Sequence, residues 1–218
     1  RMMSDSAGNL YVAFIADGIS VGGQTKNVAF VYKYDGSTWT DLTGGSGLYA
    51  SGDSGGSGAS KKKVDMAIDS SDNIYVAFYY EIVNYGTSGL VVKKYNGTSW
   101  SDVGADANGL AMTESVSSGV AIDTYNDVPY VLAANYSGVH FRKYDGSSWT
   151  DPTGGTPISS FNSAPRVMKM MAADTPYTMY QTSSSAGTWT YWDGSQWVGN
   201  GDIYTDGYTY SNTKFDIA

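Results

Sequence analysis

The apolar residues of the chain fall in short runs rich in Val, Ile, Tyr, Phe, Trp and Thr, and Asp, Asn, Ser and Gly separate one run from the next. The apolar and β-branched types favour strands, whereas the separating types favour turns. No segment repeats its apolar positions with the period of about 3.6 residues that an amphipathic helix requires. The pattern predicts an all-β protein with almost no helix.

A six-residue word recurs four times and divides the chain into repeats. It reads YDGSTW at 34–39, YNGTSW at 95–100, YDGSSW at 144–149 and WDGSQW at 192–197. A second word precedes each copy and occupies 4–14, 68–78, 122–133 and, more loosely, 172–181. A third, apolar word comes before that one at 64–68, 119–122 and 167–172. The closing tryptophans lie 61, 49 and 48 residues apart, which indicates a repeat of about 50 residues.

Each repeat is expected to contain four short strands, which we call A to D. The third word is strand A, and a turn of Asp, Ser, Asn and Gly leads to strand B in the second word. A variable loop then leads to strand C at 28–34, 90–95, 139–144 and 188–192. An Asp-Gly or Asn-Gly pair predicts a tight hairpin into strand D, with positive φ at both central residues. Because strand C does not alternate cleanly, we expect it to be buried on both faces or bulged.

Four-stranded units that repeat at this length are typical of a β-propeller, whose blades surround a common axis. A single unit cannot bury both faces of its sheet, so each blade depends on its neighbours. We therefore expect a single β-propeller domain or a fragment of one, with the recurrent Trp and Tyr side chains between four-stranded antiparallel blades. The expected repeats span 1–60, 61–112, 113–163 and 164–213.

Residues 214–218 match residues 63–67 and predict strand A of a fifth repeat. Residues 1–3 already hold most of strand A of the first repeat, so four full repeats carry one strand to spare. Three interpretations follow. The chain is a fragment of a longer propeller, or it closes on itself through this strand, or it pairs the strand with another chain, because an unpaired strand edge invites pairing.

The turn word from Asp5 to Val12, followed by a Lys residue and the Tyr-Asp-Gly-x-x-Trp word, resembles the repeats of secreted bacterial propellers of kelch-like or NHL-like spacing. The resemblance covers nearly the whole chain and implies the fold alone, because propellers host lectins, adhesins, hydrolases and scaffolds alike. The chain is also similar to the fungal fucose- and N-acetylglucosamine-binding propeller lectins, which place sugars between blades. The hairpin word looks like the Asp-box of sialidases, but the adjacent Asp35 and Gly36 depart from that spacing.

Composition and charge narrow the range of partners. The chain has 21 Asp and Glu against 13 Lys and Arg, and the net charge of −8 disfavours binding to nucleic acid. No run approaches the roughly 18 apolar residues of a membrane-spanning helix, so we expect no membrane insertion. The absence of Cys excludes disulfides, Cys-ligated metal sites and thiol catalysis.

Few residues suggest catalysis or metal binding. The single histidine, His140, occupies the strand C position that Phe30, Val91 and Thr188 hold in the other repeats, where it packs or lines a groove. Glu81 and Glu114 are the only glutamates, and nothing in the sequence brings them together as the carboxylate pair of a glycosidase. The Asp-rich turns at 69–73 and 123–127 suit side-chain capping of a turn, with calcium binding as the alternative. We expect no other cofactor.

Tyr and Trp residues are abundant at the variable positions, and an aromatic ring with a polar tip is suited to binding a sugar. The residues that we expect to contact a ligand are Tyr80, Glu81, Tyr85, Tyr136, His140 and Trp189. The first hypothesis is a non-catalytic, lectin-like bacterial module, extracellular or at the cell surface, that binds glycans between blades. The second is a structural or adhesive propeller that binds a surface protein or itself through residues 214–218. The third is a glycoside hydrolase.

Overall fold

The computed structural model describes residues 1–21, 23–49, 58–82, 87–104, 110–112, 119–135, 138–158, 165–183 and 186–205. Within these ranges the regular structure consists of β-strands in four four-stranded antiparallel sheets, and the strands of each sheet pair in chain order. This confirms the predicted all-β class and the four repeated strands, A to D. In the part of the chain that is described, no helix has the length and apolar character needed to cross a membrane.

We call the sheets blades 1 to 4. Blade 1 contains β1 (Met2–Ser4), β2 (Leu10–Val21), β3 (Gln24–Tyr34) and β4 (Trp39–Asp41). Blade 2 contains β5 (Gly58–Ile68), β6 (Ile74–Ile82), β7 (Thr87–Tyr95) and β8 (Trp100–Asp102). Blade 3 contains β9 (Val120–Tyr125), β10 (Val128–Asn135), β11 (Gly138–Tyr144) and β12 (Trp149–Thr150). Blade 4 contains β13 (Pro165–Ala172), β14 (Thr175–Ser183), β15 (Ala186–Trp192) and β16 (Trp197–Thr205).

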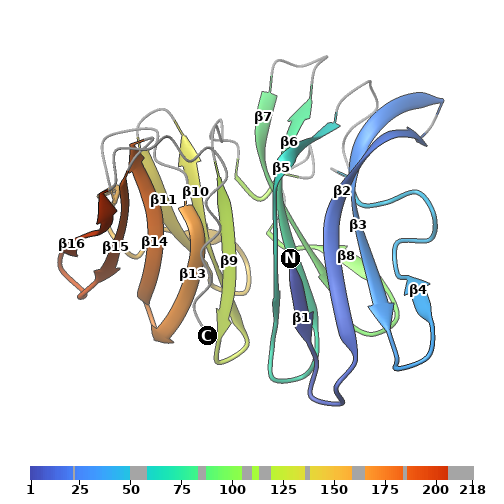
Figure 1. Cartoon of the computed structure of the whole chain (residues 1–218), viewed down its shortest axis with the longest axis horizontal. Coiled ribbons are helices and arrows are strands. Elements are labelled where there is room, and N and C mark those ends of the chain that lie inside the picture. Colours follow the sequence, from blue (N-terminus) through green and yellow to red (C-terminus); the bar gives the residue numbers. More distant parts are fainter. Residues whose placement is uncertain are drawn as a thin grey trace.

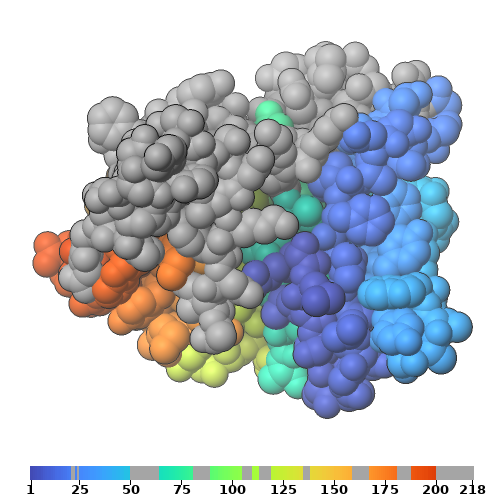
Figure 2. All heavy atoms as spheres, in the orientation of Figure 1, coloured from blue at the N-terminus to red at the C-terminus, as the bar shows by residue number. Residues whose placement is uncertain are grey.

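The blades follow one another in chain order, with blade 1 and blade 4 at opposite ends of the molecule (Figure 1). Their first strands are neighbours, since β1 contacts β5, β5 contacts β9 and β9 contacts β13. The space-filling view shows the same order, with the blue first blade at one end and the orange and red fourth blade at the other (Figure 2). The first strands therefore line the side on which the blades converge, as in a propeller.

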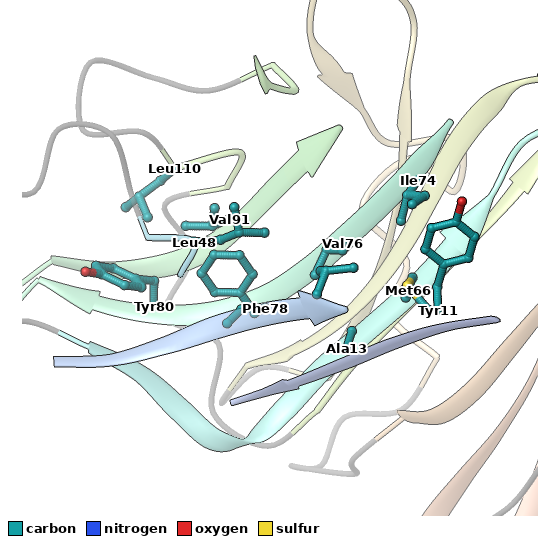
Figure 3. Packing of buried hydrophobic residues seen from close by; sticks show 12 residues of the cluster. Tyr11, Ala13, Leu48, Met66, Ile74, Val76, Phe78, Tyr80, Val91 and Leu110 are labelled. Atoms are coloured by element: carbon teal, nitrogen blue, oxygen red, sulfur yellow. The ribbon is translucent and has the colours of Figure 1, made fainter. Parts of the chain in front are cut away.

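The core lies between the blades. Alternate side chains of each sheet face the preceding and the following blade, so the centre of strand C is buried on both faces. In β7 of blade 2, which has a blade on either side, Leu90, Val91 and Val92 are consecutive and all buried, with Val91 in one inter-blade cluster and its two neighbours in the other. Figure 3 shows the cluster between blades 1 and 2, where Tyr11 and Ala13 meet side chains of blade 2. This confirms the first of the two expectations for strand C and accounts for its broken alternation.

In blades 2 to 4, the tryptophan that closes the hairpin word connects the blade to the one before it. The indole Nε1 of Trp100 donates a hydrogen bond of 2.8 Å to the carbonyl oxygen of Leu42 in blade 1. The indole of Trp149 donates in the same way to Val103 of blade 2, also at 2.8 Å, and that of Trp197 to Thr156, which follows blade 3, at 3.1 Å. The repeated Trp is therefore an inter-blade residue, as the sequence predicts.

The hairpin between strands C and D differs from the predicted two-residue turn. Tyr34 pairs with Trp39, so the loop contains four residues. Only Gly36 of the Asp-Gly pair has a positive φ, of 98°. The Asp35 carboxylate accepts hydrogen bonds from the backbone N–H groups of Ser37 and Thr38, and the Tyr34 hydroxyl donates to the Gly36 carbonyl. The prediction of a tight turn was wrong because the Asp side chain caps a wider loop.

The turns between strands A and B are also capped by aspartate. The Asp69 carboxylate accepts hydrogen bonds from the backbone N–H groups of Ser71 and Asn73, which confirms the capping interpretation at this turn. The next turn is different, because Asp123 lies within β9 and Asn126 and Asp127 form the turn with positive φ.

These turns also contact one another. The backbone N–H of Ser6 in blade 1 donates to the Asp72 carboxylate of blade 2 at 2.9 Å. That of Ser70 donates to the Asp127 carboxylate of blade 3, again at 2.9 Å. Each Ser hydroxyl donates to the same carboxylate as its own N–H group. A second polar contact therefore links successive blades, at the edge that the A–B turns form.

The two ends of the repeat array can be compared with the sequence prediction in part. Residues 2–4 form β1 and pair with Leu10, Tyr11 and Val12, so the first blade has its own strand A. Residues 214–218, predicted to form strand A of a fifth repeat, lie outside the described residues.

Candidate functional site

The six residues predicted to bind a ligand lie in different environments, and two of them are not among the described residues. Tyr85 and Tyr136 lie outside the described residues. Glu81 lies in β6, near the end of the strand. Tyr80 is fully buried in the cluster between blades 1 and 2, where Figure 3 shows it near Leu110. We therefore correct the prediction for Tyr80, because its strand position directs the side chain into the core between two sheets.

His140 lies on the face of blade 3 that packs against blade 2. It pairs with Ala133, and Ala133 belongs to the cluster between these two blades. The equivalent pairs are Phe14 with Phe30, Phe78 with Val91 and Tyr180 with Thr188, so the register confirms the equivalence read from the repeats. Its side chain is half-buried rather than enclosed.

Tyr79 lies on the opposite side of the same seam. It pairs with Leu90 on the face of blade 2 that packs against blade 3, and its half-buried ring packs against the shared cluster. Three residue pairs separate Tyr79 from the loop between β6 and β7, and two separate His140 from the loop between β10 and β11, so both lie in the half of their sheets nearer the loops between strands B and C. The seam between blades 2 and 3 therefore presents a phenol and an imidazole at its loop end, each with access to solvent. Tyr79 is one of the variable aromatic residues visible in the sequence, but the adjacent Tyr80 was predicted to bind the ligand in its place, although a spacing of four residues from Tyr75 along strand B places the Tyr79 and Tyr75 rings on one face.

A carboxylate lies deeper in this seam. Asp65 of β5 accepts a hydrogen bond of 3.0 Å from the backbone N–H of Ile122 in β9, and its other oxygen lies 3.4 Å from Nε of Arg1. Burial raises the pKa of Asp65 to about 6, although the Ile122 N–H and the Arg1 guanidinium oppose the shift. Asp65 thus links the first strands of two blades and has an altered proton affinity.

Trp189 lies at a position that packs against the next blade in the other repeats. Its equivalents by register are Val31, Val92 and Phe141, which are all buried. In blade 4, however, Trp189 is half-buried and stacks with Tyr177 and Tyr191. The rings of Tyr177 and Tyr191 lie 4.8 Å apart and within 9° of parallel.

The repeat itself explains this aromatic group. In blades 1 to 3 a lysine faces the strand B tyrosine, with Lys33 over Tyr11, Lys94 over Tyr75 and Lys143 over Tyr130. Blade 4 has Tyr191 where the other blades have this lysine. The replacement of this lysine by Tyr191 is visible in the sequence, but only the strand register shows that Tyr191 faces Tyr177.

A second aromatic surface lies on blade 1, on the side away from blade 2. Val12, Phe14, Tyr32 and Trp39 line an open apolar groove of about 350 Å³. Phe14 is 41% exposed and Trp39 is 51% exposed. Phe14 stacks on Tyr32 at 5.8 Å between ring centroids, and Tyr34 packs against Trp39 at 5.1 Å.

We next considered the carboxylates that could act in glycoside hydrolysis or bind a metal ion. Glu114, one member of the pair considered for glycoside hydrolysis, lies outside them. Among the described residues, no group of three or more His, Asp or Glu side chains is placed to hold a metal ion. The oxygens of Asp69 and Asp127 accept hydrogen bonds from turn residues instead.

No protein-family model and no curated protein matches the chain. Solved structures do match. The Aleuria aurantia lectin in complex with α-methyl-L-fucoside has a TM-score of 0.54 and 18% identity over 93% of this chain and 59% of its own. SapL1 lectin with the same type of ligand has a TM-score of 0.59 and 15% identity over 93% of this chain and 63% of its own. Another structure of the Aleuria lectin is described as a six-bladed β-propeller.

Enzymes are also similar to the chain. An N-acetylgalactosamine deacetylase from F. plautii has a TM-score of 0.52 and 15% identity over 94% of this chain and 70% of its own. Trypanosoma rangeli sialidase has a TM-score of 0.55 and 13% identity over 91% of this chain and 36% of its own. The likeness shows that the four blades are arranged as in part of a β-propeller, and the chain spans about three fifths of the length of the lectins that it matches.

Proposed function

We propose that this protein is a non-catalytic carbohydrate-binding module, secreted or displayed at the cell surface, that binds a sugar in a seam between blades. The observation that carries the proposal is the pair of half-buried side chains, Tyr79 and His140, at the loop end of the seam between blades 2 and 3. An aromatic ring packs on the C–H face of a sugar, while hydroxyl and imidazole groups bind its hydroxyls. The loop-end position also agrees with the general placement of binding sites on loops carried by a rigid scaffold.

The solved neighbours support the same class of ligand. The Aleuria and SapL1 lectins bind α-methyl fucosides on the same kind of propeller. Sialidase and deacetylase neighbours are enzymes, and among the described residues of this chain no group of three or more His, Asp or Glu side chains is placed to hold a metal ion. We favour binding over catalysis because the phenol and the imidazole that carry the proposal are suited to contacting sugar hydroxyls.

The experiment is a glycan array with the purified chain, followed by calorimetry with the best glycan and with α-methyl-L-fucoside as the first monosaccharide probe. His140→Ala is expected to weaken binding roughly tenfold, the effect of losing one hydrogen bond worth about 1.4 kcal/mol. Tyr79→Phe, which keeps the ring, is expected to weaken it less than that. Ser101→Ala, at an exposed position on β8, is the control and should bind like the wild-type protein. An array on which no glycan binds above background would refute the proposal.

A further inference from the structure

The open face of blade 1 is equivalent, position by position, to the faces that pack against a preceding blade. By strand register, the residues of blade 1 are equivalent to residues of blade 2 as follows: Met2 to Met66, Val12 to Val76 and Phe14 to Phe78. In blade 2 these side chains are buried in the cluster with blade 1. Met2 is 64% exposed and Phe14 41% exposed, whereas Phe78 is fully buried. Phe30, which pairs with Phe14 on the same face, is buried, so the open part of this blade-packing face is the area around Met2 and Phe14.

The tryptophan of blade 1 supports this equivalence independently. Trp100, Trp149 and Trp197 each donate an indole hydrogen bond to a backbone carbonyl that precedes their own blade. Trp39 is the equivalent residue of blade 1, and its indole N–H donates to none of the described residues. It is also half exposed, at 51%. A directional polar group therefore accompanies the apolar face and is positioned for a carbonyl from another blade.

The complementary surface is present at the other end of the same chain. Tyr177, Met179, Trp189 and Tyr191 occupy the positions of blade 4 that, in blades 1 to 3, face the following blade. Blade 1 and blade 4 lie at opposite ends of the molecule, so these two faces do not meet within one copy (Figures 1 and 2).

Both end faces lack the charge that their internal equivalents carry. Tyr32 of blade 1 stands where blades 2 and 3 have Lys93 and Arg142. Tyr191 of blade 4 stands where the other blades have a lysine, as described above. In blades 2 and 3 this cation pairs with Asp102 and Asp151. Asp41, the equivalent carboxylate of blade 1, lies beside Tyr32 and accepts hydrogen bonds from the backbone N–H groups of Thr43 and Gly45. Packing on this face therefore avoids the loss of hydration of a cation.

We infer that two copies of this chain associate head to tail, with the fourth blade of one copy packed on the first blade of the other. The contact repeats the geometry of the internal blade interfaces. Trp39 of one copy donates its indole N–H to a backbone carbonyl beside blade 4 of its partner. The interaction is heterologous, since two different faces meet.

The test measures mass by analytical ultracentrifugation, with two variants that each remove one face. Phe14→Lys places a charge on the blade 1 face, and Trp189→Lys places one on the blade 4 face. The wild-type protein is expected at twice the chain mass of 23.3 kDa or more, with an increase at higher concentration. Each variant alone is expected to remain a monomer. An equimolar mixture is expected to form a heterodimer, because one intact face of each kind remains.

The outcomes separate the alternatives. If Trp189→Lys still associates like the wild-type protein, the blade 1 faces meet each other and the head-to-tail contact is wrong. A wild-type monomer up to about 0.5 mM would also overturn it, since blade 1 would then be open or would require a different partner. Circular dichroism verifies that both variants are folded, and Trp39→Lys and Tyr191→Glu provide a second pair. Glycan binding through Tyr79 and His140 is expected to persist in all four variants, so this inference and the proposed function fail separately.

Discussion

The inter-blade indole hydrogen bonds allow the contribution of a single polar contact to be measured inside a repeat. Trp149→Phe removes the N–H that donates to the Val103 carbonyl at 2.8 Å and leaves that oxygen without this partner. The residue Val103 is buried, so water replaces the donor only in part. A hydrogen bond of this kind contributes about 0.5–1.5 kcal/mol, and loss of part of the indole surface adds roughly 0.5–1 kcal/mol. The expected loss in the free energy of unfolding is therefore about 1–2.5 kcal/mol.

The chain contains its own control for this measurement. Trp39→Phe changes the equivalent residue of blade 1. Trp39 packs against Tyr34 as Trp149 packs against Tyr144, but its indole N–H has no carbonyl partner among the described residues. At a protein concentration where the chain is monomeric, its expected effect is within about 0.5 kcal/mol of zero, as at other exposed positions. Trp100→Phe, which loses the bond to Leu42, should resemble Trp149→Phe.

Urea denaturation followed by circular dichroism provides the values. With a slope of about 2–3 kcal/mol per molar urea, Trp149→Phe is expected to lower the midpoint by roughly 0.5–1 M, without a change in slope. The reasoning fails if Trp39→Phe costs as much as Trp149→Phe, because the loss would then come from the aromatic pair within the blade and not from the contact between blades.

Two further measurements address backbone fit and proton binding. Gly104 and Gly154 have nearly the same φ, of 62° and 63°, but a Cβ at Gly104 would lie 2.9 Å from the Trp149 ring, whereas Gly154 has open space. Gly104→Ala is therefore expected to cost about 1–3 kcal/mol more than Gly154→Ala in urea denaturation, and equal costs would show that the chain relaxes around the added methyl. Because the folded protein holds the Asp65 proton more tightly than the unfolded chain does, its free energy of unfolding is expected to fall between about pH 4 and 6 by roughly 2–3 kcal/mol. Asp65→Asn should remove this decline and be more stable than the wild-type protein at pH 7.5; lower stability of the variant at that pH would contradict the assignment.

The repeat words predicted the sheets well because each word combines a turn signal with a strand signal. The ends of strand C at Tyr34 and Tyr95 agree with the words, but the strands extend further toward the loop between B and C, since β6 runs to Ile82 and β7 begins at Thr87. The equivalence of His140 with Phe30 and Val91 followed from the alignment of the repeats alone. The turn type of the hairpin was predicted wrongly. The Asp35 carboxylate accepts hydrogen bonds from the backbone N–H groups of Ser37 and Thr38, and these contacts stabilise a four-residue loop in place of a two-residue turn.

The candidate site was less accessible to sequence reasoning. Tyr80 and Tyr79 are adjacent, and a shift of one residue exchanges the face of the sheet on which a side chain lies. The buried ring of Tyr80 and the half-buried ring of Tyr79 can be distinguished only when the pairing with Gly89 and Leu90 is known. Trp189 likewise stood out as a variable aromatic, and only the register identifies it as a residue of the blade-packing layer.

The contacts made by Ser6 and Ser70 and by the hairpin tryptophans have a consequence for how such a chain changes over generations. Blade 2 has both kinds of junction, the Ser70 hydroxyl toward the blade ahead and the Trp100 indole toward the blade behind. Duplication of this unit by recombination would therefore carry the donors of both junctions into the longer array.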